Sequence, residues 1–170
     1  MGSTYDQIPY PSLPIQRTHP SHLAAVARLF GMLPTSPKNC RVLELGCAAG
    51  NNLLLLASHY PKSEFVGVDS SVTQIEEGLA AVNELRLENI SLEAMDLLDI
   101  DESFGAFDYV ICHGVFSWVP HSTQTGILEI GRRCLAPNGV FFISYNTYPG
   151  WHMRRAVRDM ILVRLTLAGC

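Results

Sequence analysis

The chain has 170 residues, of which 48% are apolar, and this is the size and composition of one domain with a buried core. Its formal net charge is −4, from 12 basic and 16 acidic residues, so we expect no nucleic-acid partner and no attraction to an anionic membrane. No apolar run approaches the ~20 residues of a membrane span and no secretory signal is visible, so we expect a cytoplasmic protein.

Residues 1–20 are predicted to form an extended, proline-rich arm, because each proline restricts its own backbone and that of its predecessor. The domain proper is expected over residues 21–170. Its first helix is predicted to have Thr18 or Ser21 as N-cap and to end near Gly31. The apolar stripe of this helix is predicted from four residues at helical spacing: Leu23, Val26, Ala27 and Phe30.

From residue 41 onward, strand-like and helix-like segments alternate. The predicted strands are Arg41–Leu45, Glu64–Asp69, Ile90–Met95, Phe107–His113 and Gly139–Tyr145. The predicted helices are 51–60, 72–86 with Ile75, Leu79 and Val82 inward, 122–135 with Ile127, Ile130 and Cys134 inward, and a last helix from Gly150. This alternation is typical of an α/β fold, with a parallel sheet, right-handed crossovers and helices on both faces.

The turn after the first predicted strand, in LELGCAAGNN (43–52), lies where an open α/β sheet binds its ligand. A phosphate-binding P-loop is excluded, because no Gly-Lys-Ser/Thr follows. The dinucleotide pattern G-x-G-x-x-G has Ala48 and Asn51 at two of its three glycine positions. The pattern [DE]-x-G-x-G-x-G fits Glu44, Gly46 and Gly50 and departs only at Ala48. It resembles motif I of the class I S-adenosylmethionine-dependent methyltransferases; a tight turn without a ligand is the simple alternative.

Acidic residues also follow the second and third predicted strands. A carboxylate at Asp69 can accept hydrogen bonds from both hydroxyls of a ribose, which fits NAD and S-adenosylmethionine equally well. Asp96, followed by Leu97, comes directly after the third strand. Either aspartate alone is explained by turn capping. Three acids at three strand ends, with Glu44 as the first, favour a nucleoside site, in which Glu44 lies near the cationic end of S-adenosylmethionine.

Three further segments resemble one bacterial family of class I methyltransferases, whose members carry a predicted methyltransferase regulatory domain after the catalytic fold. These segments are YDQIPYPSLPIQRTHPSHLAAVARLFGM (5–32), FDYVICHGVFSWVP (107–120) and SYNTYPGWHMRRAVRDM (144–160). The resemblance covers essentially the whole chain but names no methyl acceptor. It implies S-adenosylmethionine as cofactor, with Asp96 near the adenine amino group. The implied cofactor-binding residues are Glu44, Gly46, Cys47, Ala48, Gly50, Asp69, Asp96, Leu97 and His113.

A complete class I fold has seven strands in the order 3-2-1-4-5-7-6, whereas five are predicted here. We therefore expect strands six and seven and the regulatory region to be missing from this chain. The fifth strand would then form an exposed sheet edge, which invites pairing with another copy.

Few residues are candidates for chemistry, because the methyl donor is already activated and the protein mainly aligns the reactants. His113, after the fourth strand, is the candidate general base, and lining the adenosyl pocket is its alternative role. Asn146 could orient an acceptor atom or simply shape its turn. Cys47 is expected to pack, since no basic partner is evident. The cysteines number five, without a Cys-x-x-Cys pair, so we expect reduced thiols and no metal site.

The predicted function is therefore S-adenosylmethionine-dependent methyl transfer to an unidentified acceptor, or the cofactor-binding part of such an enzyme. Two alternatives remain open. The first is a non-catalytic sensor or scaffold that binds the nucleoside and presents the arginine-rich terminal helix to a partner. The second is an NAD(P)-linked oxidoreductase. The arm, with Tyr10 and His19, is predicted to act as a lid over the cofactor.

Overall fold

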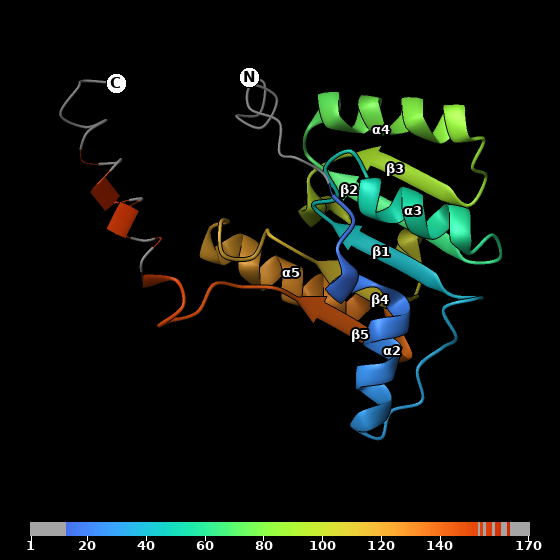
Figure 1. Cartoon of the computed structure of the whole chain (residues 1–170), viewed down its shortest axis with the longest axis horizontal. Coiled ribbons are helices and arrows are strands. Elements are labelled where there is room, and N and C mark those ends of the chain that lie inside the picture. The colour runs from blue at the N-terminus through green and yellow to red at the C-terminus, as the bar shows by residue number, and fades with distance from the viewer. Residues whose placement is uncertain (1–12, 153, 155, 158, 161–162, 164–170) are drawn as a thin grey trace.

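The computed structural model describes residues 13–152, 154, 156–157, 159–160 and 163 (Figure 1). Its strands are β1 (Arg41–Leu45), β2 (Glu64–Asp69), β3 (Ile90–Ala94), β4 (Phe107–Cys112) and β5 (Leu135–Ile143). Its α-helices are α2 (Pro20–Leu29), α3 (Asn51–His59), α4 (Val72–Leu85) and α5 (His121–Cys134). Short 3-10 helices form at η1 (Gln16–Thr18), η2 (Leu97–Asp99) and η3 (Glu102–Phe104).

The sheet is parallel throughout, in the order β3-β2-β1-β4-β5. This confirms the predicted five-stranded Rossmann-like architecture. The chain runs outward from β1 to β3 and then crosses to β4, so the topological switch point lies between β1 and β4. The arrows of β1, β3 and β5 in Figure 1 point the same way, and because the sheet is parallel, the turns after β1, β2, β3 and β4 lie at one edge.

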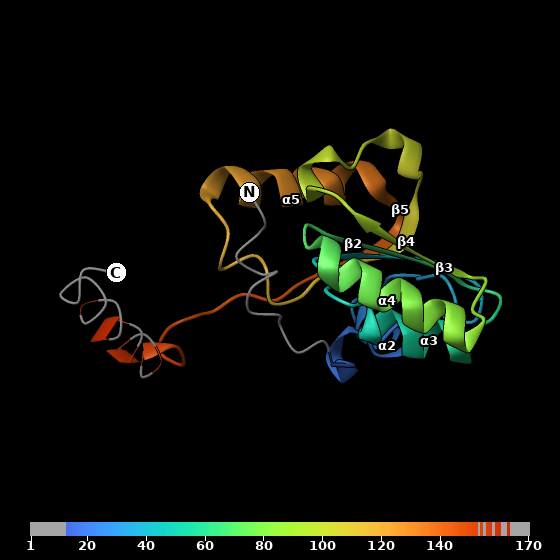
Figure 2. The ribbon, with the colours of Figure 1, turned by 90° about the horizontal axis from the view of Figure 1, so that it is seen from above.

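Helices cover both faces of the sheet. Figure 2 shows α2, α3 and α4 on one side and α5 on the other. Since side chains alternate along a strand, Val42 packs in the cluster with Leu53, whereas Leu43 packs in the cluster with Ile127. Because both faces of the sheet are buried, the sequences of its central strands are nearly continuous runs of apolar residues. Glu44 points to the same face as Val42, toward α3.

The helices confirm most of the predicted apolar faces and correct two of them. Ile75 and Val82 on α4, and the three predicted residues of α5, are buried, but Leu79 is 39% exposed. On α2, Leu23 and Ala27 are buried, whereas Val26 is 39% and Phe30 82% exposed. The predicted stripe was wrong at Phe30 because α2 ends at Leu29, and Phe30 is already its C-cap.

The start of α2 also differs from the prediction. His19 is the N-cap, and its Nδ1 accepts the Ser21 N–H at 3.1 Å. Pro20 takes the first helical position, where a missing N–H is tolerated. Neither Thr18 nor Ser21 caps the helix. Thr18 instead is fully buried, and its hydroxyl donates to the Ile15 carbonyl.

Strand ends shift by a few residues. β3 stops at Ala94 and β4 at Cys112, so Met95 and His113 belong to the loops that follow them. β5 begins earlier than predicted, at Leu135, which pairs with Phe107. The register then shifts, and regular pairing resumes at Val140, opposite Tyr109. Of the predicted helix from Gly150, the described residues beyond Trp151 are helical, and the remainder lies outside the described residues.

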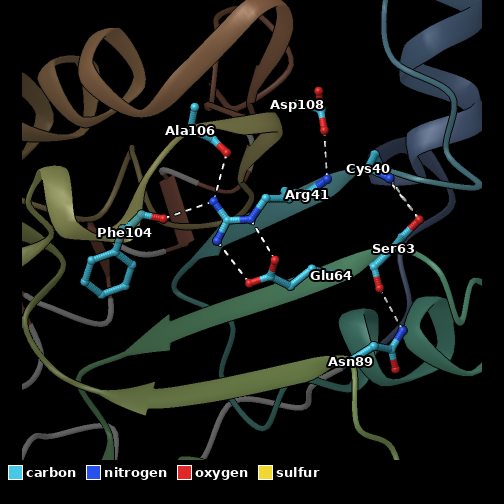
Figure 3. A network of polar contacts seen from close by, with 8 residues as sticks. All are labelled: Cys40, Arg41, Ser63, Glu64, Asn89, Phe104, Ala106 and Asp108. Atoms are coloured by element: carbon cyan, nitrogen blue, oxygen red, sulfur yellow. Dashed lines mark hydrogen bonds and ion pairs between the residues drawn. The ribbon is translucent and has the colours of Figure 1, made fainter.

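The amino-terminal edge of the sheet is held by a network around Arg41 (Figure 3). The Arg41 guanidinium binds both Glu64 carboxylate oxygens, at 2.8 and 3.0 Å, and donates to the carbonyls of Phe104 and Ala106. The Arg41 N–H donates to Asp108 Oδ2 at 2.8 Å. This network joins β1, β2 and the start of β4 at the edge opposite the ligand-binding turns.

Candidate functional site

The turn between β1 and α3 adopts a backbone that suits small residues. Gly46, Ala48 and Gly50 have φ of +74°, +52° and +71°. A Cβ on Gly46 would lie 2.4 Å from Val115 Cγ2, so the loop after β4 packs directly onto this glycine. The residue that departs from the glycine pattern, Ala48, therefore also has left-handed geometry, which costs an alanine about 1–2 kcal/mol.

Asp69 holds this turn in place. Its Oδ2 accepts the Ala48 N–H at 2.8 Å, and its Oδ1 accepts the Ser71 N–H at 2.9 Å. One carboxylate thus fixes the turn after β1 and the entry to α4. Each of its oxygens retains a lone pair, so these bonds leave room for hydroxyl donors from a ligand.

A cavity of about 310 Å³ opens at this edge of the sheet. Its walls come from the loops after β1, β2, β3 and β4. The predicted site residues among them are Gly46, Ala48, Asp69, Asp96, Leu97 and His113. Asp96 caps η2, since its Oδ1 accepts the Leu98 N–H at 2.9 Å. The structure therefore brings together the acids after β2 and β3 and the histidine after β4, as the sequence predicts.

Other wall residues were missed by sequence reasoning. Val68, Ser70, Gln74, Met95, Gly114, Val115, Val119 and Thr123 complete the wall. Ser70, Met95, Gly114 and Val115 lie one to three residues beyond a strand end, which was the only available signal. Val115, Val119 and Met95 make one side of the cavity apolar, as a planar base requires for its faces.

Glu44 lies behind the turn and not in the cavity wall. It is 5% exposed, and its Oε1 accepts the Asn52 Nδ2 at 3.0 Å. Its Oε2 is buried without a hydrogen-bond partner among the described residues. Burial raises the pKa of Glu44 to about 7, which the bond from Asn52 offsets only in part. A cation close to the turn would supply the favourable partner that this carboxylate lacks.

His113 presents a neutral imidazole to the cavity. Burial lowers the pKa of this side chain, and its ring stacks on Phe142 with 6.2 Å between centroids. Its Nδ1 is buried and has no partner within the described part of the chain. An unprotonated ring nitrogen is able to accept a proton or a hydrogen bond from a bound molecule.

Cys47 and Asn146 are placed differently. Cys47 is 4% exposed, and a Cβ on Gly67 would lie 2.8 Å from its sulfur, so this side chain packs against β2. Burial raises the pKa of the Cys47 thiol, which makes it a poor nucleophile. Asn146 is exposed, its N–H donates to Ser117 Oγ at 2.8 Å, and it is absent from the described cavity wall.

Aromatic side chains gather just beyond β4 and β5. Phe116 lies against Tyr145, and Trp118 against Trp151, with 6.5 and 5.7 Å between ring centroids. Trp118 and Tyr145 are more than half exposed. Phe116 and Trp118 directly follow or precede Val115 and Val119 in the chain, so this aromatic cluster lies next to the β4 side of the cavity.

This fold and cavity define a class I methyltransferase domain. The methyltransferase-domain family matches residues 36–160, which is most of the chain, and the chain belongs to that family. This favours the methyltransferase prediction over a dinucleotide-linked oxidoreductase.

Several proteins similar to this chain are methyltransferases or resemble them in structure. The chain is 45% identical to the uncharacterized protein RP028 of Rickettsia prowazekii over 94% of its own length and 64% of that protein's. It is 32% identical to a trans-aconitate 2-methyltransferase of Variovorax paradoxus, covering 75% of this chain and 44% of that enzyme. The structure of PKMT2 from Rickettsia typhi in complex with AdoHcy superposes with a TM-score of 0.86 at 45% identity, covering 91% of this chain and 30% of that one. The chain thus spans less than two thirds of each of these proteins.

Among the described residues, no helix has both the length and the apolar character needed to cross a membrane. Within the same residues, no group of three or more His, Cys, Asp or Glu side chains is placed to hold a metal ion.

Proposed function

We propose that the cavity binds S-adenosylmethionine and that this chain is the cofactor-binding part of a methyltransferase. The observation that carries the proposal is the cavity itself. It is walled by Gly46 and Ala48 after β1, Asp69 after β2, Asp96 after β3 and His113 after β4. The AdoHcy complex of the 45% identical PKMT2 supports it, since AdoHcy is the same nucleoside without the transferred methyl group.

Each part of the ligand is proposed to contact a different set of residues. Asp69 accepts from the ribose hydroxyls, while its bonds to Ala48 and Ser71 keep the turn closed around them. Asp96 and the backbone at Leu97 meet the adenine amino edge, and Val119 and Met95 cover its faces. Gly46 and Ala48 let the backbone approach the amino acid end, with the charge of Glu44 behind the turn.

Methyl transfer then needs little from the protein. A nucleophile on the acceptor forms a bond to the methyl carbon, and the carbon–sulfur electron pair returns to sulfur, giving S-adenosylhomocysteine. His113 is our proposed general base for an acceptor that must lose a proton, since its ring lines the cavity and its Nδ1 has no hydrogen-bond partner among the described residues. Asn146, at the exit of β5, remains a proposed acceptor ligand.

The acceptor is proposed to enter on the β4 side, beside Phe116 and Trp118. Trans-aconitate, the acceptor in the name of the Variovorax relative, is a polycarboxylate. None of the described residues in the cavity wall is lysine or arginine. The acceptor side does carry a basic group, since the Arg154 guanidinium lies 5.5 Å from the centroid of the Trp151 ring, which contacts Trp118.

The proposal is tested by thermal shift with S-adenosylhomocysteine and with NADH, on wild type, Asp96→Ala and Asp99→Ala. Asp99 is an exposed acid three residues further on and serves as the matched control. We expect S-adenosylhomocysteine to raise the Tm of the wild type and of Asp99→Ala. Asp96→Ala should need at least ~10-fold more ligand for the same rise in Tm. A response to NADH alone would reject the proposal. Binding without transfer across a wide acceptor panel would favour a sensor or scaffold.

Three finer predictions also stand as proposals. The first is a cytoplasmic setting, supported by four buried free cysteines among the described residues. The second is membership of the family with a C-terminal regulatory domain. The third is self-association through β5, which forms one edge of the described sheet.

A further inference from the structure

A polar chain connects the segment before α2 to the turn that forms the cavity. Asn52, in the first turn of α3, is its centre and is 7% exposed. Its Oδ1 accepts the Ile15 N–H at 3.0 Å, and its Nδ2 donates to Thr18 Oγ1 and to Glu44 Oε1, both at 3.0 Å. Figure 1 shows this blue segment lying against the carboxyl end of β1.

Both of the Asn52 bonds to this segment depend on one amide orientation. Reversing the amide would present N–H to N–H at Ile15 and oxygen to oxygen at Glu44. The Glu44 carboxylate therefore selects the orientation that docks residues 15–18. An ionised acceptor strengthens the bond from Nδ2 and, through the polarised amide, the bond from Ile15 to Oδ1.

We propose that Asn52 is a positioning residue that couples docking of residues 13–19, hereafter the strap, to the charge on Glu44 and so to the cationic end of the bound methyl donor. This rests on the proposed function. A cation at the turn ionises Glu44, and the ionised carboxylate tightens the strap through Asn52. By linkage, a docked strap raises affinity for the cationic ligand by the same factor.

Among the described residues, no other charged group competes for the Glu44 carboxylate. The titratable groups that interact electrostatically with it are Cys47 in the turn and Cys112 on β4. Burial raises the pKa of both thiols, of Cys112 to about 12, so both are neutral near pH 7. Asn52 from α3 is a neutral donor. His19, at the far end of the strap, has a pKa lowered by burial and is uncharged.

Hydrogen exchange of the Ile15 amide tests the proposal, because this N–H is donated to Asn52. S-adenosylhomocysteine, which keeps the ammonium group, is expected to slow Ile15 exchange about tenfold in the wild type. Asn52→Ala should abolish that slowing and weaken ligand binding about tenfold. The matched control is Asn89→Ala, a similar asparagine whose Nδ2 binds the carbonyls of Ala57, Tyr60 and Ser63 at the far end of α3. It should lose stability but keep the response of Ile15.

A ligand-free arm separates this inference from the proposed function. Raising the pH from 5 to 8 ionises Glu44 and should slow Ile15 exchange, after correction for intrinsic rates, in the wild type but not in Glu44→Gln. If the ligand fails to bind and this pH response is present, the proposed function fails and the coupling stands. An Ile15 amide that responds to neither ligand nor pH, or responds equally in Asn52→Ala, overturns the inference.

Discussion

Replacing Glu44, the buried acid near the end of β1, should stabilise the protein while weakening its ligand site. Glu44→Gln keeps an oxygen that accepts from Asn52, but it removes a carboxylate that is 5% exposed and whose Oε2 has no hydrogen-bond partner within the described part of the chain. Because the folded-state pKa of Glu44 is raised from 4.5 to about 7, its contribution to stability is fully present below about pH 4.5. This contribution is lost as the pH rises to about 7, and above that pH the group causes no further change in stability.

The loss amounts to about 3 kcal/mol of unfolding free energy between these pH values. At pH 5 the folded-state side chain is still neutral and less than about 1 kcal/mol of this contribution is lost, so wild type and Glu44→Gln should unfold at similar urea concentrations. At pH 8 the variant should be more stable by about 1–3 kcal/mol, or several degrees in Tm. Glu93→Gln, an exposed acid on β3, is the control and should show no such pH-dependent gain. A Glu44→Gln variant that is no more stable than wild type at pH 8 refutes the reasoning.

Further predictions concern the turn and the opposite edge of the sheet. Gly46→Ala should lower the free energy of unfolding by about 2–4 kcal/mol, because of the positive φ of Gly46 and its contact with Val115. Adding Val115→Ala should recover only the part due to the contact. Additive losses in a double-mutant cycle measured by urea unfolding would argue against this contact. Ala48→Gly should keep or raise stability, because φ is +52°, whereas Ala49→Gly should lower it by about 0.5–1 kcal/mol; equal losses would show that Ala48 is not strained. Arg41→Gln should lower unfolding free energy by about 1–2 kcal/mol, allowing for its partial exposure, and leave S-adenosylhomocysteine affinity unchanged in calorimetry. A large affinity loss in Arg41→Gln would mean that the two edges of the sheet are coupled.

Local patterns sufficed for the features that depend on short-range geometry. The alternation of strand and helix patterns predicts the sheet, and parallel strands necessarily bring Asp69 and Asp96 to one edge. Spacing also located Gly46 and Ala48, because a turn whose backbone comes close to a ligand favours small residues. The ends of elements were less predictable, since Phe30 continues the apolar spacing of α2 although the helix stops one residue earlier.

Long-range polar contacts could not be predicted from the sequence. Asn52 meets Ile15 and Thr18 across 37 and 34 residues, and no periodicity marks such a pair. The same holds for Asp69, whose bond to the Ala48 N–H spans 21 residues and makes it a turn-forming residue as well as a ribose candidate. Val115 and Val119 line the cavity because of how one loop folds over Gly46, which composition alone does not indicate.

Calorimetric titration of S-adenosylhomocysteine into the folded chain asks whether the cavity is a methyl-donor site. We expect saturable binding at one site per chain, with weaker binding for Asp69→Ala and unchanged binding for Asp99→Ala. Circular dichroism of each sample verifies that the protein is folded. A folded chain that produces no binding heat at two temperatures with millimolar S-adenosylhomocysteine would show that the cavity does not bind this nucleoside.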